Sequence, residues 1–93
     1  MPRRSDTNQP EIVEALRDVG GLVLDLHEVG ADCPDVLVLF REVLTLLEIK
    51  SPGGKLTPGQ QVFHDLWRVA ARGRVYIVRS VEDAYRAVGV EVT

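Results

Sequence analysis

The chain has 93 residues, a length that favours one domain near the lower limit at which a single hydrophobic core supports folding. Hydrophobic residues make up 45% and charged residues 27% of the chain, without blocks of like charge, which argues against a disordered protein. The net charge of -3 argues against a protein that coats nucleic acid, because such a protein would neutralise many phosphates.

Nothing in the sequence indicates secretion or membrane insertion. Residues 1–6 lack the apolar core of a signal peptide, and the longest unbroken apolar run, residues 36–40, is far too short to span a bilayer. The single cysteine, Cys33, has no second cysteine with which to form an internal disulfide or a zinc cluster. We therefore expect a cytosolic protein and interpret Cys33 as a small loop residue.

The first expected element is an amphipathic helix. It begins after Asn8, whose side chain can cap the helix while Glu11 returns the hydrogen bond, and it ends at Gly20-Gly21. Apolar residues at helical spacing predict a buried stripe, namely Ile12, Val13, Leu16 and Val19.

Three strands are expected to follow this helix. Residues 22–26 are expected to form a first strand, and residues 35–40 and 43–50 two more. Only Arg41-Glu42 separates the second strand from the third, so the sequence predicts a β-hairpin.

The C-terminal half is expected to contain a helix, a strand and a final helix. Thr57-Pro58-Gly59-Gln60 combines a capping box with proline at the first helical position. The helix that begins there is expected to turn its apolar residues inward: Val62, Phe63, Leu66, Val69 and Ala70. A short strand at residues 75–78 and a helix capped by Ser80 complete the pattern.

This order of elements, α-β-β-β-α-β-α, predicts an α/β fold in which helices flank a mixed β-sheet. No linker or internal repeat divides the chain, so residues 1–93 are expected to form one domain. The ends, residues 1–7 and 90–93, are expected to fray.

The two hairpin strands carry charged residues at one end. If Phe40 pairs with Val43 across the turn, Asp35 falls directly opposite Glu48 on the same face. Cross-strand partners have Cβ atoms about 4.5–5.5 Å apart, where like charges repel. A divalent cation would remove this repulsion, because Mg²⁺ binds one or two carboxylates and keeps several waters. Lys50 lies two residues beyond Glu48 and therefore points to the same side.

Such a group of residues suits the hydrolysis of phosphodiesters. A bound metal lowers the pKa of its water and stabilises charge on the phosphate, while a lysine ammonium can orient the water or neutralise developing charge. The alternative interpretation is that Asp35, Glu48 and Lys50 are exposed charges at strand ends, with Lys50 neutralising Glu48. Their spacing alone does not decide between the two.

The motif Pro34-Asp35, a hairpin and Glu48-Ile49-Lys50 resembles the active-site pattern of PD-(D/E)xK nucleases. Within that superfamily the chain is similar to stand-alone VRR-NUC domains, virus-type replication-repair nucleases that resemble Holliday junction resolvases and are common in phages. The segments that carry the similarity extend over most of the chain: residues 8–11, 30, 34–38, 47–50, 56–60 and 78–82. The resemblance implies a restriction-endonuclease-like core.

The resemblance also implies roles for individual residues. The implied catalytic residues are Asp35, Glu48, Lys50 and Gln60. The implied ligands of Mg²⁺ or Mn²⁺ are Glu11, Asp35, Glu48 and the backbone carbonyl of Ile49. Both Glu11 and Gln60 occupy the third position of a capping box, so a purely structural role stays open for each. The turn at residues 30–35 is longer than in the family, and Asp32 is interpreted as a solvated loop residue, with an additional site carboxylate as the alternative.

Candidate DNA contacts are basic or polar residues near the expected site: Arg3, Arg4, Lys55, His64 and Arg68. Arg72, Arg74 and Arg79 add to the basic character of the C-terminal half. The two histidines, His27 and His64, lack the spacing of a zinc site and are otherwise expected on the surface.

We therefore expect a Mg²⁺- or Mn²⁺-dependent endodeoxyribonuclease in the cytoplasm of a bacterium or of a phage-infected host. Its resemblance implies selectivity for branched DNA such as Holliday junctions. The small size and the twofold symmetry of such a junction favour a homodimer, formed through the stripe around Trp67 or the final helix with Tyr85. Two alternatives stay open: a non-catalytic binding or interaction module with the nuclease fold, and a nuclease subunit directed by a replication or repair partner.

Overall fold

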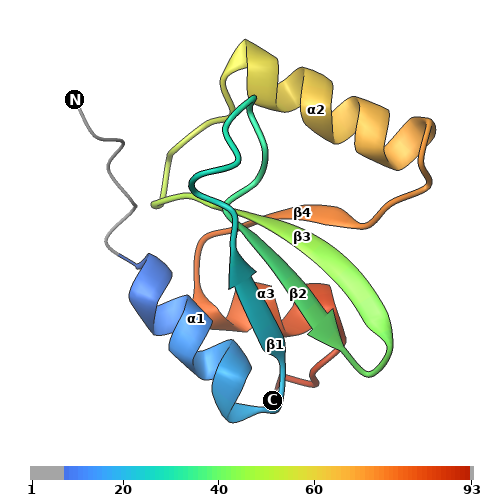
Figure 1. The fold of residues 1–93 in the computed structure, drawn as a ribbon. Coiled ribbons are helices and arrows are strands. Elements are labelled where there is room, and N and C mark those ends of the chain that lie inside the picture. Colours follow the sequence, from blue (N-terminus) through green and yellow to red (C-terminus); the bar gives the residue numbers. More distant parts are fainter. Residues whose placement is uncertain (1–7, 93) are drawn as a thin grey trace.

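A computed structural model describes residues 8–92, and its elements follow in the order α-β-β-β-α-β-α (Figure 1). The elements are α1 (Gln9–Asp18), β1 (Leu22–Asp25), β2 (Val36–Phe40), β3 (Val43–Ile49), α2 (Pro58–Val69), β4 (Val75–Val78) and α3 (Val81–Val88). The predicted α/β fold class is confirmed. Two of the candidate DNA contacts, Arg3 and Arg4, lie outside the described residues.

The four strands form one mixed sheet in the order β1-β2-β3-β4. The first three strands are antiparallel neighbours, whereas β4 runs parallel to β3 after the crossover through α2. The hairpin has the predicted register, from Phe40 opposite Val43 to Val36 opposite Leu47. Arg41 and Glu42 both have positive φ, at 50° and 69°, as a tight hairpin turn that follows the twist of its strands requires.

The two faces of the sheet are covered unequally. α1 and α3 pack side by side on one face, where Val36, Val38 and Phe40 point into a core shared with Ile12 and Leu16. α2 lies on the opposite side of the sheet (Figure 1). Because side chains alternate along a strand, residues at odd positions of β2 face the side of α2.

The prediction for the inward side of α2 is wrong for Val62, Leu66, Val69 and Ala70, which are exposed, whereas Phe63 is half-buried. Val62, Leu66 and Val69 are exposed at 56%, 61% and 81%, whereas Gln60 and His64 are buried. The helix contacts β4 and the end of the sheet that carries polar side chains, so its polar residues are the ones that are covered. Hydrophobic periodicity identified the helix but not the side on which it packs.

Two of the three expected helix caps are confirmed. Thr57 and Gln60 form the capping box of α2, and Ser80 accepts a hydrogen bond from the amide of Asp83 at the start of α3. The expected cap on α1 is wrong, because the side-chain amide of Asn8 instead donates to the carbonyls of Lys50 at 3.2 Å and Arg79 at 3.1 Å. This contact ties the start of α1 to the ends of β3 and β4.

The expected fraying of the C-terminus does not extend to Val90. Its amide donates to the carbonyl of Tyr85 at 2.8 Å, and its side chain packs against the core. Among residues 8–92, no helix has both the length and the apolar character needed to cross a bilayer.

Gly73 lies against the indole ring of Trp67 in the connection between α2 and β4. The ring is held by stacking on Phe63, with centroids 6.1 Å apart, and by a hydrogen bond from its Nε1 to the carbonyl of Arg74. A Cβ atom at position 73 would overlap this ring. We expect Gly73→Ala to lower the free energy of unfolding by about 1–3 kcal/mol, measured by denaturant titration, because the ring must move. The cost should disappear in a Trp67→Ala background, and an equal cost in both backgrounds would contradict the steric explanation.

Candidate active site

Asp35, Glu48 and Lys50 meet at one end of the sheet, on the side of α2. Asp35 immediately precedes β2, Glu48 is the penultimate residue of β3, and Lys50 immediately follows β3. Their neighbours Val36 and Ile49 point into the core on the other face, so strand alternation turns the three charged side chains away from it. The hairpin thus brings together the three residues that the sequence motif predicts as catalytic.

Asp35 is held close to β3 by two hydrogen bonds. Its backbone amide donates to the carbonyl of Leu47 at 3.1 Å, and its carboxylate accepts from the amide of Ile49 at 2.7 Å. The pairing thus departs from the expected one, in which Asp35 stands directly opposite Glu48, although the register is as predicted up to Val36 and Leu47. Asp35 is 8% exposed, and its carboxylate lies next to the backbone between Glu48 and Lys50.

Glu48 is fully buried, and so is the histidine that faces it. The Nε2 atom of His64 lies 3.5 Å from Oε1 of Glu48, and both side chains are 0% exposed. Burial lowers the pKa of His64, with Arg68 and Lys50 acting in the same direction and Asp65 opposing them. The imidazole is therefore neutral at neutral pH, with one nitrogen as donor and the other as acceptor. Because it is buried, the prediction that His64 contacts DNA is wrong.

Gln60 links the lysine to α2. Its Oε1 accepts hydrogen bonds from Nζ of Lys50 at 3.0 Å and from the backbone amide of Thr57 at 2.9 Å. The two roles that the sequence left open, helix capping and support of the site, are thus combined in one atom. The contact holds the lysine ammonium at the end of β3.

Glu11 does not join these residues. Its side chain is exposed on α1, which turns Gln9 and Ile12 toward the protein instead. Within residues 8–92, no three His, Cys, Asp or Glu side chains lie close enough together to hold a metal ion. The expectation that Glu11 completes an acidic cluster is therefore not met in this structure.

The remaining donors fit a hard divalent cation that binds few protein groups. Asp35 and Glu48 supply carboxylates, and the carbonyl of Ile49 points to the same side as its amide, which bonds to Asp35. Mg²⁺ is commonly bound by one or two carboxylates, with water and substrate phosphate completing its octahedron. These three groups are the ones that would hold the ion.

The basic residues near the site differ in whether their side chains are exposed and able to contact DNA. Lys55 and Arg68 are exposed, so both stay candidates for DNA contacts. Arg79 instead donates to the carbonyl of Gly54 and holds the loop before α2, while Arg74 donates to Thr45 and to the carbonyl of Ala87. Arg74 and Arg79 thus have structural contacts within the domain.

Asp32 lies at the start of α2, where its carboxylate faces Gly59 closely enough that a side chain there would collide with it. A carboxylate at a helix N-terminus interacts favourably with the helix dipole. The longer turn at residues 30–35 therefore contacts the start of α2. This contact explains the presence of Asp32, which need not be a metal ligand.

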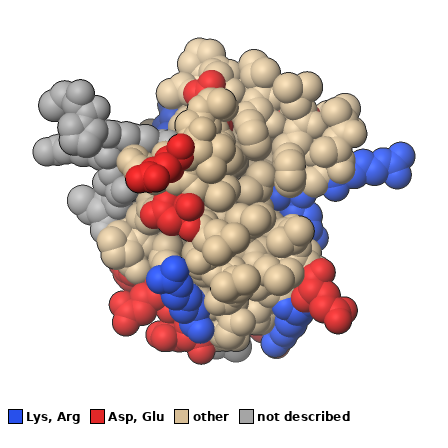
Figure 2. Space-filling model, viewed as in Figure 1, with Lys and Arg blue, Asp and Glu red and all other residues tan. Residues whose placement is uncertain are grey.

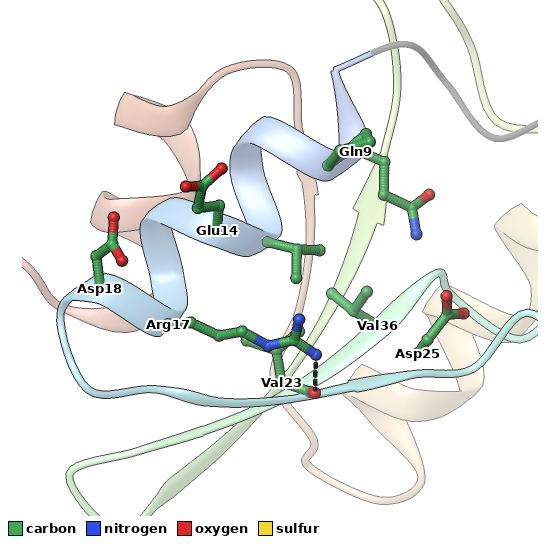
Figure 3. A pocket seen from close by; sticks show the side chains of 9 residues that line it. Gln9, Glu14, Arg17, Asp18, Val23, Asp25 and Val36 are labelled. Carbon is green, nitrogen blue, oxygen red and sulfur yellow. Dashed lines mark hydrogen bonds between the residues drawn. The ribbon is translucent and has the colours of Figure 1, made fainter.

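A pocket between α1 and β1 is separate from this site (Figure 3). Its lining includes three carboxylates, from Glu14, Asp18 and Asp25, while the guanidinium of Arg17 donates to the carbonyl of Val23 at 3.1 Å. None of the predicted catalytic residues lines it. An acidic pocket of this kind does not suit a phosphate group.

The sequence did not predict the contacts that Asn8 and His64 make near the site, which are those of Asn8 with Lys50 and Arg79 and of His64 with Glu48. Asn8 was assigned to a helix cap, and His64 to the protein surface. The recurrence of polar residues at Gln60 and His64, four positions apart on one helix, was the available signal for a polar inward side.

Comparison with known proteins supports the assignment of the fold. No family model matches the sequence, and no curated protein matches it. A solved structure described as a VRR_NUC domain matches with a TM-score of 0.71 and 26% identity, over 89% of this chain and 96% of that one. The chain thus has the VRR-NUC fold, that of a nuclease-type domain.

Proposed function

We propose that the protein is a Mg²⁺- or Mn²⁺-dependent endodeoxyribonuclease that hydrolyses phosphodiester bonds. The observation that carries the proposal is the placement of two buried carboxylates, Asp35 and Glu48, beside a lysine that Gln60 holds in position. A nuclease-type fold around the same residues supports it. The burial of two carboxylates costs stability, and a bound cation would offset part of that cost.

The cation, when bound, activates water and neutralises charge on the phosphate. Asp35 and Glu48 would hold the cation through their carboxylates, and the Ile49 carbonyl would add a neutral ligand. Lys50 orients the attacking water or stabilises the charge that develops on the phosphate oxygens. Gln60 fixes the ammonium by a 3.0 Å hydrogen bond, which lowers the entropy that the flexible lysine loses in the transition state.

The proposed substrate is branched DNA such as a Holliday junction, a preference that rests on the resemblance to VRR-NUC domains. The test is cleavage by the purified chain of a four-way junction, a linear duplex and a single strand, each with Mg²⁺, with Mn²⁺ and with EDTA. We expect metal-dependent cleavage with the junction cut fastest. Equal rates on all three substrates would contradict the proposed preference for branched DNA, and cleavage in EDTA would contradict the proposed dependence on a metal.

If the junction is cut only after addition of a replication or repair protein, the chain is a nuclease subunit directed by that partner. Metal-dependent cutting by the chain alone contradicts this alternative.

We further propose that the active form is a symmetric homodimer. Four leucines on the side of the sheet opposite the main core are exposed at 39–56%: Leu22, Leu24, Leu39 and Leu44. We call them the leucine surface. Figure 2 shows a broad uncharged area on the side of the molecule that Figure 1 presents, with charged side chains mainly toward its margins. Twofold pairing would cover this surface with an identical one.

The two earlier candidates for the dimer face differ in their exposure. Trp67 is partly buried against Phe63, and Tyr85 packs against the core. The stripe of α2 beside Trp67 does expose apolar side chains, at Val62, Leu66 and Val69, so the test below compares this stripe with the leucine surface.

A charge within the leucine surface should prevent dimerisation. We expect Leu44→Glu to be monomeric at micromolar concentration by light scattering, because twofold pairing would bring two buried carboxylates close together. Val69→Glu is the matched control, since Val69 is more exposed, at 81%, but lies on α2, and this variant should stay dimeric. A dimeric Leu44→Glu protein would contradict the proposed surface, and a monomeric wild type would contradict the dimer.

A further inference from the structure

The side of α2 that faces the sheet contacts both charged residues of the Glu48-Ile49-Lys50 segment. Gln60 and His64 lie one helical turn apart and are both buried, at 7% and 0% exposure. Gln60 accepts a hydrogen bond from Lys50, and His64 lies 3.5 Å from the carboxylate of Glu48. One turn of α2 therefore contacts both charged side chains, Lys50 through Gln60 and Glu48 through His64.

We propose that His64 is a positioning residue whose Nε2, 3.5 Å from Oε1 of Glu48 and not hydrogen-bonded to it in this structure, closes onto this oxygen when the carboxylate binds the cation and so fixes its orientation. The inference rests on the proposed function and assigns His64 a role in cation affinity. His64 acts through Glu48 and does not itself touch the cation or the substrate.

Both side chains are buried, so the contact between them affects the free energy of the Glu48 carboxylate more than an exposed contact would. A carboxylate removed from water loses its hydration and needs hydrogen-bond donors in exchange. An imidazole N–H is such a donor, and Nε2 of His64 is the imidazole atom that faces the carboxylate of Glu48. His64 also lies outside the core between the sheet, α1 and α3, so filling that core does not explain its burial.

The rotation of the carboxylate is the property that this contact controls. Removal of the imidazole takes away the group that lies against Oε1 of Glu48 and widens the space open to the carboxylate. Groups that orient metal ligands in this way typically contribute 10–100-fold to metal affinity. The hydrogen bond between Gln60 and Lys50 places the ammonium and is not expected to contribute to cation affinity in the same way.

The experiment compares His64→Leu with His64→Gln by calorimetric titration with Mn²⁺ in the absence of DNA. We expect His64→Leu to weaken Mn²⁺ binding by about 10–100-fold. Glutamine places its amide nitrogen close to the position of Nε2, so His64→Gln should recover most of the affinity. Trp67→Leu, one turn further along α2, removes another partly buried ring and should leave the affinity unchanged.

A second measurement separates positioning from packing. At saturating Mn²⁺, the single-turnover cleavage rate of His64→Leu should return toward that of the wild type, because the lost affinity is restored by mass action. If His64→Leu does not fold, as judged by its melting transition in EDTA, His64→Asn replaces it, since its shorter amide does not reach the position of Nε2.

The outcomes distinguish this inference from the proposed function. Wild-type Mn²⁺ affinity in His64→Leu, or equal losses in His64→Leu and His64→Gln, would overturn the role of His64 while the nuclease proposal stands. If the wild type binds Mn²⁺ no more tightly than Glu48→Gln does, the metal site itself fails. Weak binding by the leucine variant with recovery by glutamine supports both.

Discussion

Glu48→Gln is expected to reduce metal-dependent cleavage by more than about a hundredfold, the upper value for residues that only orient a ligand. The variant keeps the shape of the side chain and its contact with His64 but removes the negative charge that binds the cation. Because Glu48 is fully buried, loss of its charge should leave the melting temperature in EDTA equal to or above that of the wild type. DNA binding should persist, since it depends mainly on basic residues.

Single-turnover cleavage, thermal melting in EDTA and fluorescence anisotropy with labelled DNA test the three parts. Asp35→Ala serves as the comparison, because it should also abolish cleavage but should be less stable. Its carboxylate accepts a hydrogen bond from Ile49, and loss of a bond to a charged group costs about 1.5–3 kcal/mol. Cleavage at the wild-type rate by either variant would remove that residue from the active site.

Lys50→Met is expected to lower the single-turnover rate by about 10²–10³-fold while Mn²⁺ affinity is retained. The ammonium serves the transition state, so its loss appears in the chemical step and not in binding of the cation. Methionine is a similar unbranched chain, and Gln60 still accepts the amide of Thr57, so the start of α2 should be unaffected.

Lys55→Met provides the control, since it removes the same charge from an exposed position on the neighbouring loop. This variant should cleave at the wild-type rate under single-turnover conditions with saturating enzyme and should bind DNA more weakly. If Lys50→Met also keeps the wild-type rate, the lysine only neutralises Glu48, which is the alternative that the sequence left open.

Site residues whose positions depend on contacts between neighbouring segments were predicted correctly, whereas one that depends on distant segments was not. Asp35, Glu48 and Lys50 were brought together by strand alternation and the register of a two-residue hairpin, which are properties of neighbouring segments. Gln60 was assigned to the site by the resemblance, and its capping box, a contact within four residues, places it at the start of α2. Glu11 was misplaced because the side that α1 turns toward the sheet depends on segments distant in sequence.

The sequence by itself determined the order of the elements, the hairpin register and the caps at Thr57 and Ser80, because each depends on periodicity or on contacts within a few residues. Only the tertiary structure decided which side of α2 is buried and what Asn8 binds. α2 carries both an apolar stripe and a polar side, and the buried carboxylate of Glu48 favours polar neighbours, so Gln60 and His64 face the sheet while Val62, Leu66 and Val69 face outward. That choice depends on the free energy of the whole arrangement, which no local pattern contains.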